Sequence, residues 1–460
     1  MTFNSHSFTV HSKLRYILGK NMTTELSINK INNALANAEP KKALLVSVYK
    51  NSSQKHQCEE HLQELELLVD TFGMKTVQKI PCFIRKYDAS LFVTTGKLEE
   101  LILAADTSKV DLVIFDDEIT PGQQRNLEKA FKKTVIDRTE VILGVFAQRA
   151  QTKEARLQIE LAQVKYQAPR LKRLWTHLSR QSGTGSSGGG GAYLKGEGEK
   201  QIEIDRRILK KQVEQLQKEI REVQGHRDTQ RVSRVKSEIP IFAIIGYTNA
   251  GKSTLLNTMT DANVFVEDKL FATLDTTTRK FTMGNNQEIL LIDTVGFIRK
   301  LPHLLVAAFK STLEEAIQAD ILLHLVDVSH PMAEEQAATT FDVLKELGAG
   351  EKPVITVLNK VDKVTDPAMI DRMRILYPKT VQISALHRTG FEELQELMIQ
   401  EMNKRRKLVE LRIPQSEYAL VSEVMRSGKI VKQSYEENDV LLSVELPLAL
   451  ANKLENYIQK

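Results

Sequence analysis

Residues 246–253 of this chain read GYTNAGKS, and this stretch decides the fold. It fits the pattern GxxxxGK[ST] and follows an apolar run, Ile239 to Ile245, that has the length of a buried strand. In such a loop, backbone N–H groups close around phosphates and the following helix adds its positive N-terminus. We expect Lys252 to reach the β- and γ-phosphates and the hydroxyl of Ser253 to bind Mg²⁺. The predicted phosphate-binding residues are Gly246, Tyr247, Thr248, Asn249, Ala250, Gly251, Lys252 and Ser253.

Strands and helices alternate regularly after this loop. Strand-like runs follow at Glu288–Asp293, Ile321–Val328, Val354–Leu358 and Val381–Ser384, with helical stretches between them. This alternation is typical of an α/β fold with a doubly wound, mostly parallel sheet. Residues 240–406 are therefore predicted to form one nucleotide-binding domain.

A second motif selects the base. Asn359, Lys360, Val361 and Asp362 read NKVD and follow a predicted strand at the sheet edge where ligands bind. A carboxylate at Asp362 can accept hydrogen bonds from N1–H and the 2-amino group of guanine. Adenine offers neither donor and would leave the carboxylate desolvated without a partner. We expect Asn359 to contact the other edge of the base and tie down the loop, and Lys360 to lie along the ring. The motif predicts GTP as the nucleotide.

Two further segments complete the expected site. Asp293 can hold Mg²⁺ through water, and the N–H of Gly296 can sense the γ-phosphate. The loop after the last strand should turn a backbone N–H toward guanine O6. These segments add Asp293, Thr294, Val295 and Gly296, then Ser384, Ala385 and Leu386.

Residues 271–279 form the expected mobile loop between the first two phosphate motifs. A threonine hydroxyl here could complete the Mg²⁺ shell and respond to the γ-phosphate. Spacing alone leaves four candidates open: Thr273, Thr276, Thr277 and Thr278. The loop adds Phe271, Ala272, Thr273, Leu274 and Asp275 to the predicted GTP site.

Phe297 follows Gly296, where many GTPases carry a glutamine that orients the attacking water. A phenylalanine ring cannot do this, and the alternative is that Phe297 belongs to the core. We expect slow intrinsic hydrolysis that is triggered when a partner rearranges the site.

The chain of 460 residues is long enough for several domains. Residues 1–40 are predicted to be a poorly ordered tail. Residues 41–138 should form an α/β subdomain, with strands at Ala43–Tyr49, Ile80–Arg85 and Leu112–Phe115. Residues 139–239 are expected to form a helical hairpin whose two apolar stripes flank a glycine-rich loop. Residues 407–460 are predicted to be a small α+β domain in the order strand, helix, strand, strand, helix.

The charge is concentrated in the hairpin. The chain carries a formal net charge of +5, yet residues 151–240 hold 19 Lys and Arg against 11 Asp and Glu, a net of +8. No acidic residue lies between Leu161 and Gly196, which indicates a polyanionic partner. Aromatic residues are interleaved, and they either stack on bases or anchor the hairpin core. The RNA-binding candidates are Lys165, Arg170, Lys172, Arg173 and Arg180.

Other functions are disfavoured by composition. No apolar run approaches the roughly 18 residues of a membrane-crossing helix, and the start of the chain does not resemble a secretory signal. Cys58 and Cys82 match no metal spacing and are expected to be reduced, buried thiols. We expect a cytoplasmic protein without membrane insertion.

The motifs together resemble the HflX family of ribosome-associated GTPases. The segments that carry the resemblance are GYTNAGKST, FATLDTTTR, DTVGFIRKLPHLLVAAFKSTLEEA, NKVD, TTGKLEEL, LQIELAQVKYQAPRL and GEGEKQIEIDRR. The resemblance implies Ser253 and Thr273 as the direct Mg²⁺ ligands. It also implies GTP-dependent binding to the large (50S) ribosomal subunit and its rRNA, and splitting or rescue of stalled 70S ribosomes. This chain departs from the family at Thr276, where proline is usual, and in its glycine-rich loop, Gly183 to Gly198, which lacks arginine.

Two other functions remain open from the sequence. An ATP-using RNA-remodelling enzyme would share the basic hairpin, but NKVD argues against ATP. A signalling GTPase with a protein partner would leave the basic hairpin incidental. The expected protein is a monomer that binds GTP and GDP.

Overall fold

The computed structural model describes residues 40–181, 204, 206–225, 239–260, 269–274, 276–284, 287–302, 318–404, 406–436 and 438–459. The predicted tail (1–40) and glycine-rich loop therefore lie almost entirely outside the described residues. The chain divides into two compact units, Met1–Gln148 with Ile159–Leu216, and Arg149–Gln158 with Gln217–Lys460. The segment predicted as a separate hairpin, 139–239, is shared between these units.

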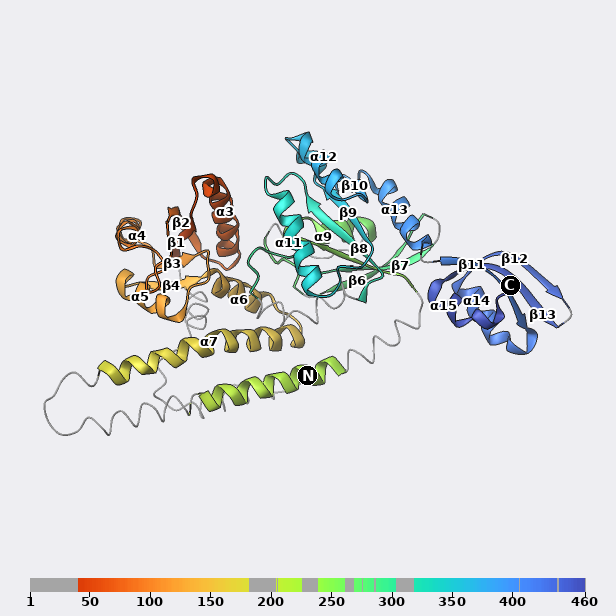
Figure 1. The fold of residues 1–460 in the computed structure, drawn as a ribbon, viewed down its shortest axis with the longest axis horizontal. Helices are drawn as coiled ribbons and strands as arrows, with labels where there is room; N and C mark the ends of the chain where they lie inside the picture. The colour runs from red at the N-terminus through yellow and green to blue at the C-terminus, as the bar shows by residue number, and fades with distance from the viewer. Residues whose placement is uncertain are drawn as a thin grey trace, which may run out of the picture. The chain divides into compact units, whose positions relative to one another are not determined.

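The first unit contains a parallel four-stranded sheet in the order β2-β1-β3-β4 (Figure 1). Helices α4 and α5 contribute apolar side chains to the same core cluster as β1 and β3. The elements are β1 Lys42–Tyr49, α3 Lys55–Thr71, β2 Lys75–Phe83, α4 Thr95–Thr107, β3 Leu112–Phe115, α5 Pro121–Phe131, β4 Thr134–Asp137 and α6 Arg138–Arg149. The expected α/β subdomain is present, with β4, α5 and α6 added to the predicted elements.

A long helix, α7 (Lys153–Gln181), follows this sheet and passes through Pro169. A proline inside a helix usually ends or kinks it, but α7 continues beyond Pro169 to Gln181. Pro169 has no backbone N–H to donate to the carbonyl oxygen of Lys165, and the Arg170 side chain donates to the carbonyl oxygen of the following residue, Tyr166, at 3.1 Å. Residues 206–225 are also helical. Gln212 Nε2 donates to Glu160 Oε1 at 3.3 Å, so this second helix lies beside α7 as the matching apolar stripes predict.

The second unit contains a six-stranded sheet in the order β10-β9-β8-β5-β7-β6. Every neighbouring pair is parallel except β6 and β7, which confirms the doubly wound, mostly parallel fold. The strands are β5 Ile241–Gly246, β6 Thr277–Thr282, β7 Glu288–Asp293, β8 Ile321–Asp327, β9 Val354–Asn359 and β10 Thr380–Gln382. Residues 277–279 were expected in a mobile loop, but they begin β6, because β-branched threonines favour an extended backbone.

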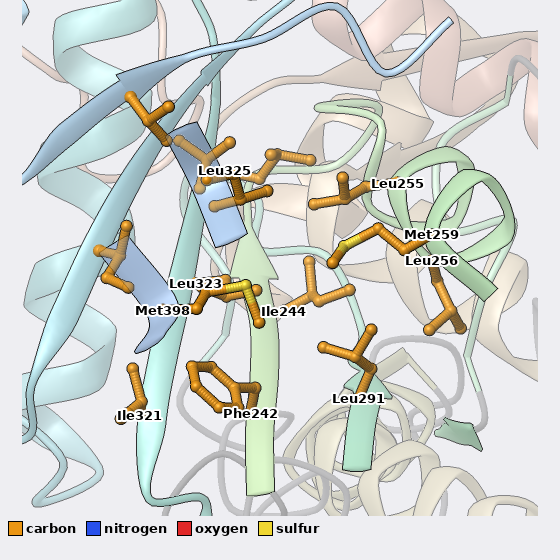
Figure 2. Close-up of a cluster of buried hydrophobic side chains, with 14 of the residues drawn as sticks. Phe242, Ile244, Leu255, Leu256, Met259, Leu291, Ile321, Leu323, Leu325 and Met398 are labelled. Atoms are coloured by element: carbon orange, nitrogen blue, oxygen red, sulfur yellow. The ribbon is translucent and has the colours of Figure 1, made fainter. Parts of the chain in front are cut away.

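Helices cover both faces of this sheet. On one face, α9 (Lys252–Thr260) and α13 (Phe391–Asn403) bury their apolar sides against the strands, and Figure 2 shows this cluster. On the other face, α11 (Ala333–Glu346) and α12 (Pro367–Leu376) pack against the ends of β8 and β9. Central strands buried on both faces read as continuous apolar runs, which explains why the sequence predicted them well.

The C-terminal part has the predicted order of elements. Strands β11 (Arg406–Pro414), β12 (Lys429–Glu436) and β13 (Asp439–Pro447) form an antiparallel sheet in the order β11-β13-β12. Helices α14 (Tyr418–Ser427) and α15 (Leu448–Lys453) share one apolar core with this sheet. Four 3-10 turns complete the described elements: Ser52–Gln54, Val361–Lys363, Gln415–Glu417 and Glu455–Tyr457.

Neither cysteine forms a disulfide, and both are buried, as expected. Burial raises the pKa of the Cys82 thiol to about 11, so this thiol is inert at neutral pH. Within the described parts of the chain, no helix has the length and apolar character that a membrane crossing needs.

Candidate functional site

The phosphate-binding loop joins β5 to α9 at the carboxyl edge of the six-stranded sheet. Gly246 and Gly251 have φ values of +150° and +96°, which side chains rarely adopt. A Cβ on Gly246 would lie 2.2 Å from the carbonyl oxygen of Leu325, and one on Gly251 would lie 2.4 Å from Asn359 Nδ2. Both glycines are therefore required, because the loop passes directly against its neighbours.

Lys252 is held inside this loop. Its Nζ donates to the carbonyl oxygens of Tyr247 at 2.7 Å and Gly246 at 3.3 Å. An ammonium carries three N–H groups, so one donor remains for a phosphate. Burial lowers the pKa of Lys252 from 10.5 to about 8, although the nearby Asp293 raises it. The loop holds a buried cation that a triphosphate would stabilise.

Three oxygen-bearing side chains meet beside Lys252. Ser253 Oγ lies 2.7 Å from Thr273 Oγ1 and donates to Asp293 Oδ2 at 2.6 Å. The other carboxylate oxygen, Asp293 Oδ1, is buried and has no hydrogen-bond partner among the described residues. Burial raises the pKa of Asp293, because the ionised carboxylate is unfavourable away from water. A nearby cation would stabilise the ionised form. Hard oxygen ligands and an unpaired carboxylate oxygen fit Mg²⁺, and Thr273 is the threonine that reaches Ser253.

The segment after β7 is tied to the phosphate-binding loop. Phe297 N donates to the carbonyl oxygen of Gly246 at 3.0 Å, and its carbonyl oxygen accepts from Thr248 N at 2.8 Å. Phe297 is 1% exposed, so the alternative that it belongs to the core is confirmed. The Tyr247 hydroxyl also accepts the backbone N–H of Arg299 at 2.7 Å. The residues that follow Gly296 are thus hydrogen-bonded directly to the predicted phosphate-binding loop.

The residues predicted to recognise the base lie at the carboxyl ends of β9 and β10. Asn359 is 2% exposed and joins three loops: its Nδ2 donates to the carbonyl oxygen of Ala250 at 2.8 Å, and its Oδ1 accepts from Ala385 N at 3.0 Å. This confirms that Asn359 ties down the loop, while its contact with the base stays a prediction. A hydrogen bond from Ser384 lowers the pKa of Asp362, which keeps this carboxylate ionised.

The other residues predicted for the base site do not gather around Asp362, and each has different surroundings. Lys360 Nζ pairs with Asp327 Oδ2 at 2.7 Å, and Val361 packs against the core cluster under α11 and α12. Leu386 is 68% exposed. Of these residues, Asp362 is therefore the one whose carboxylate could accept hydrogen bonds from the base.

The predicted phosphate residues mostly line one pocket. This pocket includes Thr248, Asn249, Gly251, Lys252, Ser253, Phe271, Ala272, Thr273 and Gly296. Ala250, Leu274, Thr294 and Val295 are buried nearby in the core, and Asp275 lies outside the described residues. Sequence reasoning missed Thr254 and Lys269, which also line the pocket. Lys269 stands two residues before Phe271, and its positive charge next to a phosphate motif was the available signal.

Arg170 has a role that differs from its prediction as an RNA contact. Its guanidinium donates to Asp137 Oδ2 and the carbonyl oxygen of Ile119, both at 3.1 Å, and to Gln124 Oε1 at 3.2 Å. It also stacks over the Tyr166 ring at 3.5 Å. The structure therefore gives Arg170 a structural role inside the first unit, and its prediction as an RNA contact stays a prediction.

Tyr166 belongs to the same cluster. It is 2% exposed and donates to Asp137 Oδ1 at 2.7 Å, which confirms the core alternative for this aromatic residue. Lys165 is half-buried. The side chains of Lys172, Arg173 and Arg180 lie outside the described part of α7.

Arg170→Ala should destabilise the protein by about 3–5 kcal/mol, because it leaves the fully buried Asp137 without its cation. Urea unfolding followed by circular dichroism measures this change. Lys165→Ala, on the same helix, is the control and should change stability by no more than about 0.5 kcal/mol. Equal stability of the two variants would contradict the structural role of Arg170.

GTP binding should weaken as the pH rises through 8. Lys252 has a pKa of about 8 in the loop, and bound phosphates favour its charged form, so binding takes up a proton above this pH. We expect a roughly fivefold loss of affinity between pH 8 and pH 9, and little change between pH 6.5 and pH 7.5. Fluorescence titration with a labelled GTP tests this. Lys252→Arg, which stays charged, should remove the dependence, and an unchanged slope in that variant would exclude Lys252 as its origin.

Taken together, the loop around Lys252, the Asp293–Gly296 segment and the Asn359–Asp362 motif at one sheet edge define a P-loop GTPase. Residues 59–147, 149–234 and 241–360 match the families described as GTP-binding GTPase N-terminal, GTP-binding GTPase Middle Region and 50S ribosome-binding GTPase. GTPase HflX of Chlamydia pneumoniae is 45% identical over 91% of this chain and 89% of its own length. The chain belongs to the GTPase HflX family.

Other relatives cover the chain to a similar extent. GTPase HflX of Escherichia coli K12 is 40% identical over 88% of this chain and 93% of its own length. Among solved structures, a GTP-binding protein from the archaeon Sulfolobus solfataricus in complex with GDP is 24% identical, covers 78% of this chain and 98% of its own, and has a TM-score of 0.42.

Proposed function

We propose that this GTPase binds the large (50S) ribosomal subunit in its GTP-bound form and splits or rescues stalled 70S ribosomes, with GTP hydrolysis releasing it. The observation that supports this most is the match of residues 241–360 to a family described as 50S ribosome-binding GTPase. The proposed place of action is the cytoplasm, where the protein would act on the ribosome as a monomer.

The chemistry of the nucleotide site follows from its own residues. Lys252 would neutralise charge on the β- and γ-phosphates, and Gly296 would report the γ-phosphate through its N–H. Ser253 and Thr273 would hold Mg²⁺, which when bound neutralises charge on the phosphate oxygens. The contacts of Phe297 and Arg299 with the phosphate-binding loop give the segment Thr294–Lys300 a path by which the nucleotide state changes its position.

A two-state switch then connects the nucleotide to the ribosome. GTP would favour one arrangement of the segments Phe271–Arg279 and Thr294–Lys300, and GDP the other. The GTP arrangement would have the higher affinity for the 50S subunit and would displace contacts between subunits. Because Phe297 is buried and apolar, intrinsic hydrolysis should be slow until the ribosome rearranges the site.

The rRNA-binding surface that we propose consists of Lys165, Lys172, Arg173 and Arg180, without Arg170. These residues lie in the stretch from Leu161 to Gly196 that has no acidic side chain. Basic side chains that replace counterions on phosphates make binding dependent on salt.

Co-pelleting with purified 50S subunits tests this proposal. We compare a non-hydrolysable GTP analogue, GDP and a non-hydrolysable ATP analogue over a series of salt concentrations. Of the three nucleotides, only the GTP analogue should give strong binding. The logarithm of the association constant should fall linearly with the logarithm of the salt concentration. Binding that requires the ATP analogue would favour an RNA-remodelling ATPase, and no binding under any condition would favour a signalling GTPase.

A triple variant in which three positive charges are reversed tests the proposed rRNA-binding surface. Lys172→Glu, Arg173→Glu and Arg180→Glu together should reduce the salt slope by about three. The matched control reverses Lys86, Lys129 and Lys432, three exposed lysines outside the basic stretch. Equal losses in the two triples would show that net charge, rather than this surface, controls binding.

A further inference from the structure

Asp327, the last residue of β8, places a negative charge at the edge of the sheet where the nucleotide is expected. Strand β8 lies between β5, which leads into the phosphate-binding loop, and β9, which leads into the NKVD motif. A nucleotide that reaches from Lys252 to Asp362 must therefore pass over the carboxyl end of β8. A carboxylate in this position would repel the phosphates unless a positive charge compensates for it.

The compensating charge belongs to Lys360, within the NKVD motif. Its Nζ pairs with Asp327 Oδ2 at 2.7 Å, and the side chains of the lysine and the aspartate are 24% and 13% exposed. The other carboxylate oxygen, Asp327 Oδ1, accepts from Ser329 N at 3.0 Å and from Ser329 Oγ at 2.6 Å. Both oxygens of Asp327 are thus used, one for a turn and one for the lysine.

The turn alone does not account for the charge of Asp327. An asparagine in this position would accept from Ser329 in the same way and would not repel phosphates. The second oxygen has a charged partner, and a hydrogen bond between two charged groups is roughly twice as strong as one between neutral groups. The charge of Asp327 therefore serves Lys360 rather than the turn.

The backbone around Lys360 is fixed by the neighbouring strands. Val328 N donates to the carbonyl oxygen of Asn359 at 3.2 Å, and Val361 N donates to the carbonyl oxygen of Ile383 at 3.4 Å. Lys360 has a φ of +62°, a left-handed conformation that costs a lysine more than a glycine. Because its backbone and its ammonium are both held, the four-carbon stem of Lys360 runs from the end of β9 toward the end of β8.

We propose that Asp327 is a positioning residue for the nucleotide. Its carboxylate holds the ammonium of Lys360, so that the apolar stem of this lysine forms a fixed surface against which the guanine ring packs. A stem that is ordered before the nucleotide arrives loses less conformational entropy on binding. This role rests on the guanine site around Asp362 and does not depend on the ribosome.

Equilibrium titration of the purified full chain with fluorescent GTP, GDP and inosine triphosphate tests this role. In Asp327→Asn, the amide oxygen still supports the turn at Ser329, but the ammonium loses its carboxylate. The affinities for all three nucleotides should fall by the same factor, about 5- to 20-fold, because the stem packs on the ring and does not contact the 2-amino group. At saturating GTP, the single-turnover rate of hydrolysis should stay within about twofold, because the lost contact is the same in the ground state and the transition state.

A double variant separates this role from a structural one. Lys360→Met keeps an apolar side chain and removes the ammonium, so it leaves the carboxylate of Asp327 without its lysine. Adding Asp327→Asn to Lys360→Met should therefore cause no further loss of GTP affinity, whereas a structural role would lower the affinity in either background. The matched control is Glu288→Gln, which breaks an exposed pair with Lys280 at the opposite edge of the sheet and should change no affinity.

Three outcomes would overturn the proposal. The first is unchanged affinity for GTP and GDP in Asp327→Asn. The second is an equal loss with and without Lys360→Met, which would show that Asp327 acts independently of Lys360. The third is a loss that spares inosine triphosphate, which would assign Asp327 to the 2-amino group of the base.

Asp362→Asn, measured alongside, separates these outcomes from failure of the guanine site itself. Unchanged GTP affinity in Asp362→Asn would overturn that site and this proposal with it. Weakened GTP binding in Asp362→Asn, together with normal binding in Asp327→Asn, would overturn the role of Asp327 alone.

Discussion

Asp362→Asn should weaken GTP binding by about 100- to 1,000-fold and allow xanthosine triphosphate to bind instead. The carboxylate is expected to accept from guanine N1–H and the 2-amino group, and each hydrogen bond to a charged group contributes about 1.5–3 kcal/mol. An asparagine would point an N–H at the 2-amino group, so two donors would meet. Xanthine has a carbonyl oxygen in that position, which an asparagine N–H can serve. Ser384 lowers the pKa of Asp362, so the acceptor is present at neutral pH.

Equilibrium titration with fluorescent GTP, XTP and ATP measures this change of specificity. The matched control is Asp366→Asn, at a nearby carboxylate that caps α12 by accepting from Ala368 N. Asparagine caps helices as well as aspartate, so this control should leave all three affinities unchanged. Unchanged GTP affinity in Asp362→Asn would overturn the guanine assignment, and improved ATP binding would support an ATP-dependent function.

Lys252→Ala should reduce GTP hydrolysis by at least about 100-fold, because it removes the cation that stabilises charge developing on the γ-phosphate. The free protein should remain folded and equally or more stable at pH 7. Burial lowers the pKa of Lys252 to about 8, so its charged form is unfavourable in the folded state below that pH, and alanine removes this cost.

Single-turnover hydrolysis and thermal melting of the same preparations measure both effects. Lys280→Ala removes an exposed lysine that pairs with Glu288 at 2.6 Å, and it should change neither quantity appreciably. A Lys252→Ala protein that hydrolyses GTP at the normal rate would contradict the assigned role. Partial unfolding of this variant would mean that Lys252 is a structural residue.

The sequence predicted the nucleotide-binding fold well because its central strands are buried on both faces. Runs such as Ile321–Val328 are apolar throughout, and no helix pattern competes with them. Strand β6 was missed because it is an edge strand, TTRKFT, whose polar residues resemble a loop. Helix α5 carries a start signal in its sequence, a capping box of Thr120 and Gln123 around Pro121.

The position of the nucleotide site could also be predicted from the order of the strands. Motifs that come after parallel strands meet at one edge of the sheet, so Lys252, Asp293 and Asn359 could be placed together without coordinates. Arg170 could not be assigned in this way. A basic residue among other basic residues resembles a phosphate contact, and its partners Asp137 and Gln124 lie 33 and 46 positions away.

Sedimentation of purified 70S ribosomes through a sucrose gradient tests the central claim most directly. The protein is added with GTP, with a non-hydrolysable GTP analogue, or with GDP, and Asp362→Asn with GTP is the matched control. We predict that either triphosphate removes the 70S peak and moves the protein to the 50S fraction, while GDP and the variant do neither. Intact 70S ribosomes with the protein at the top of the gradient in every condition would contradict this account.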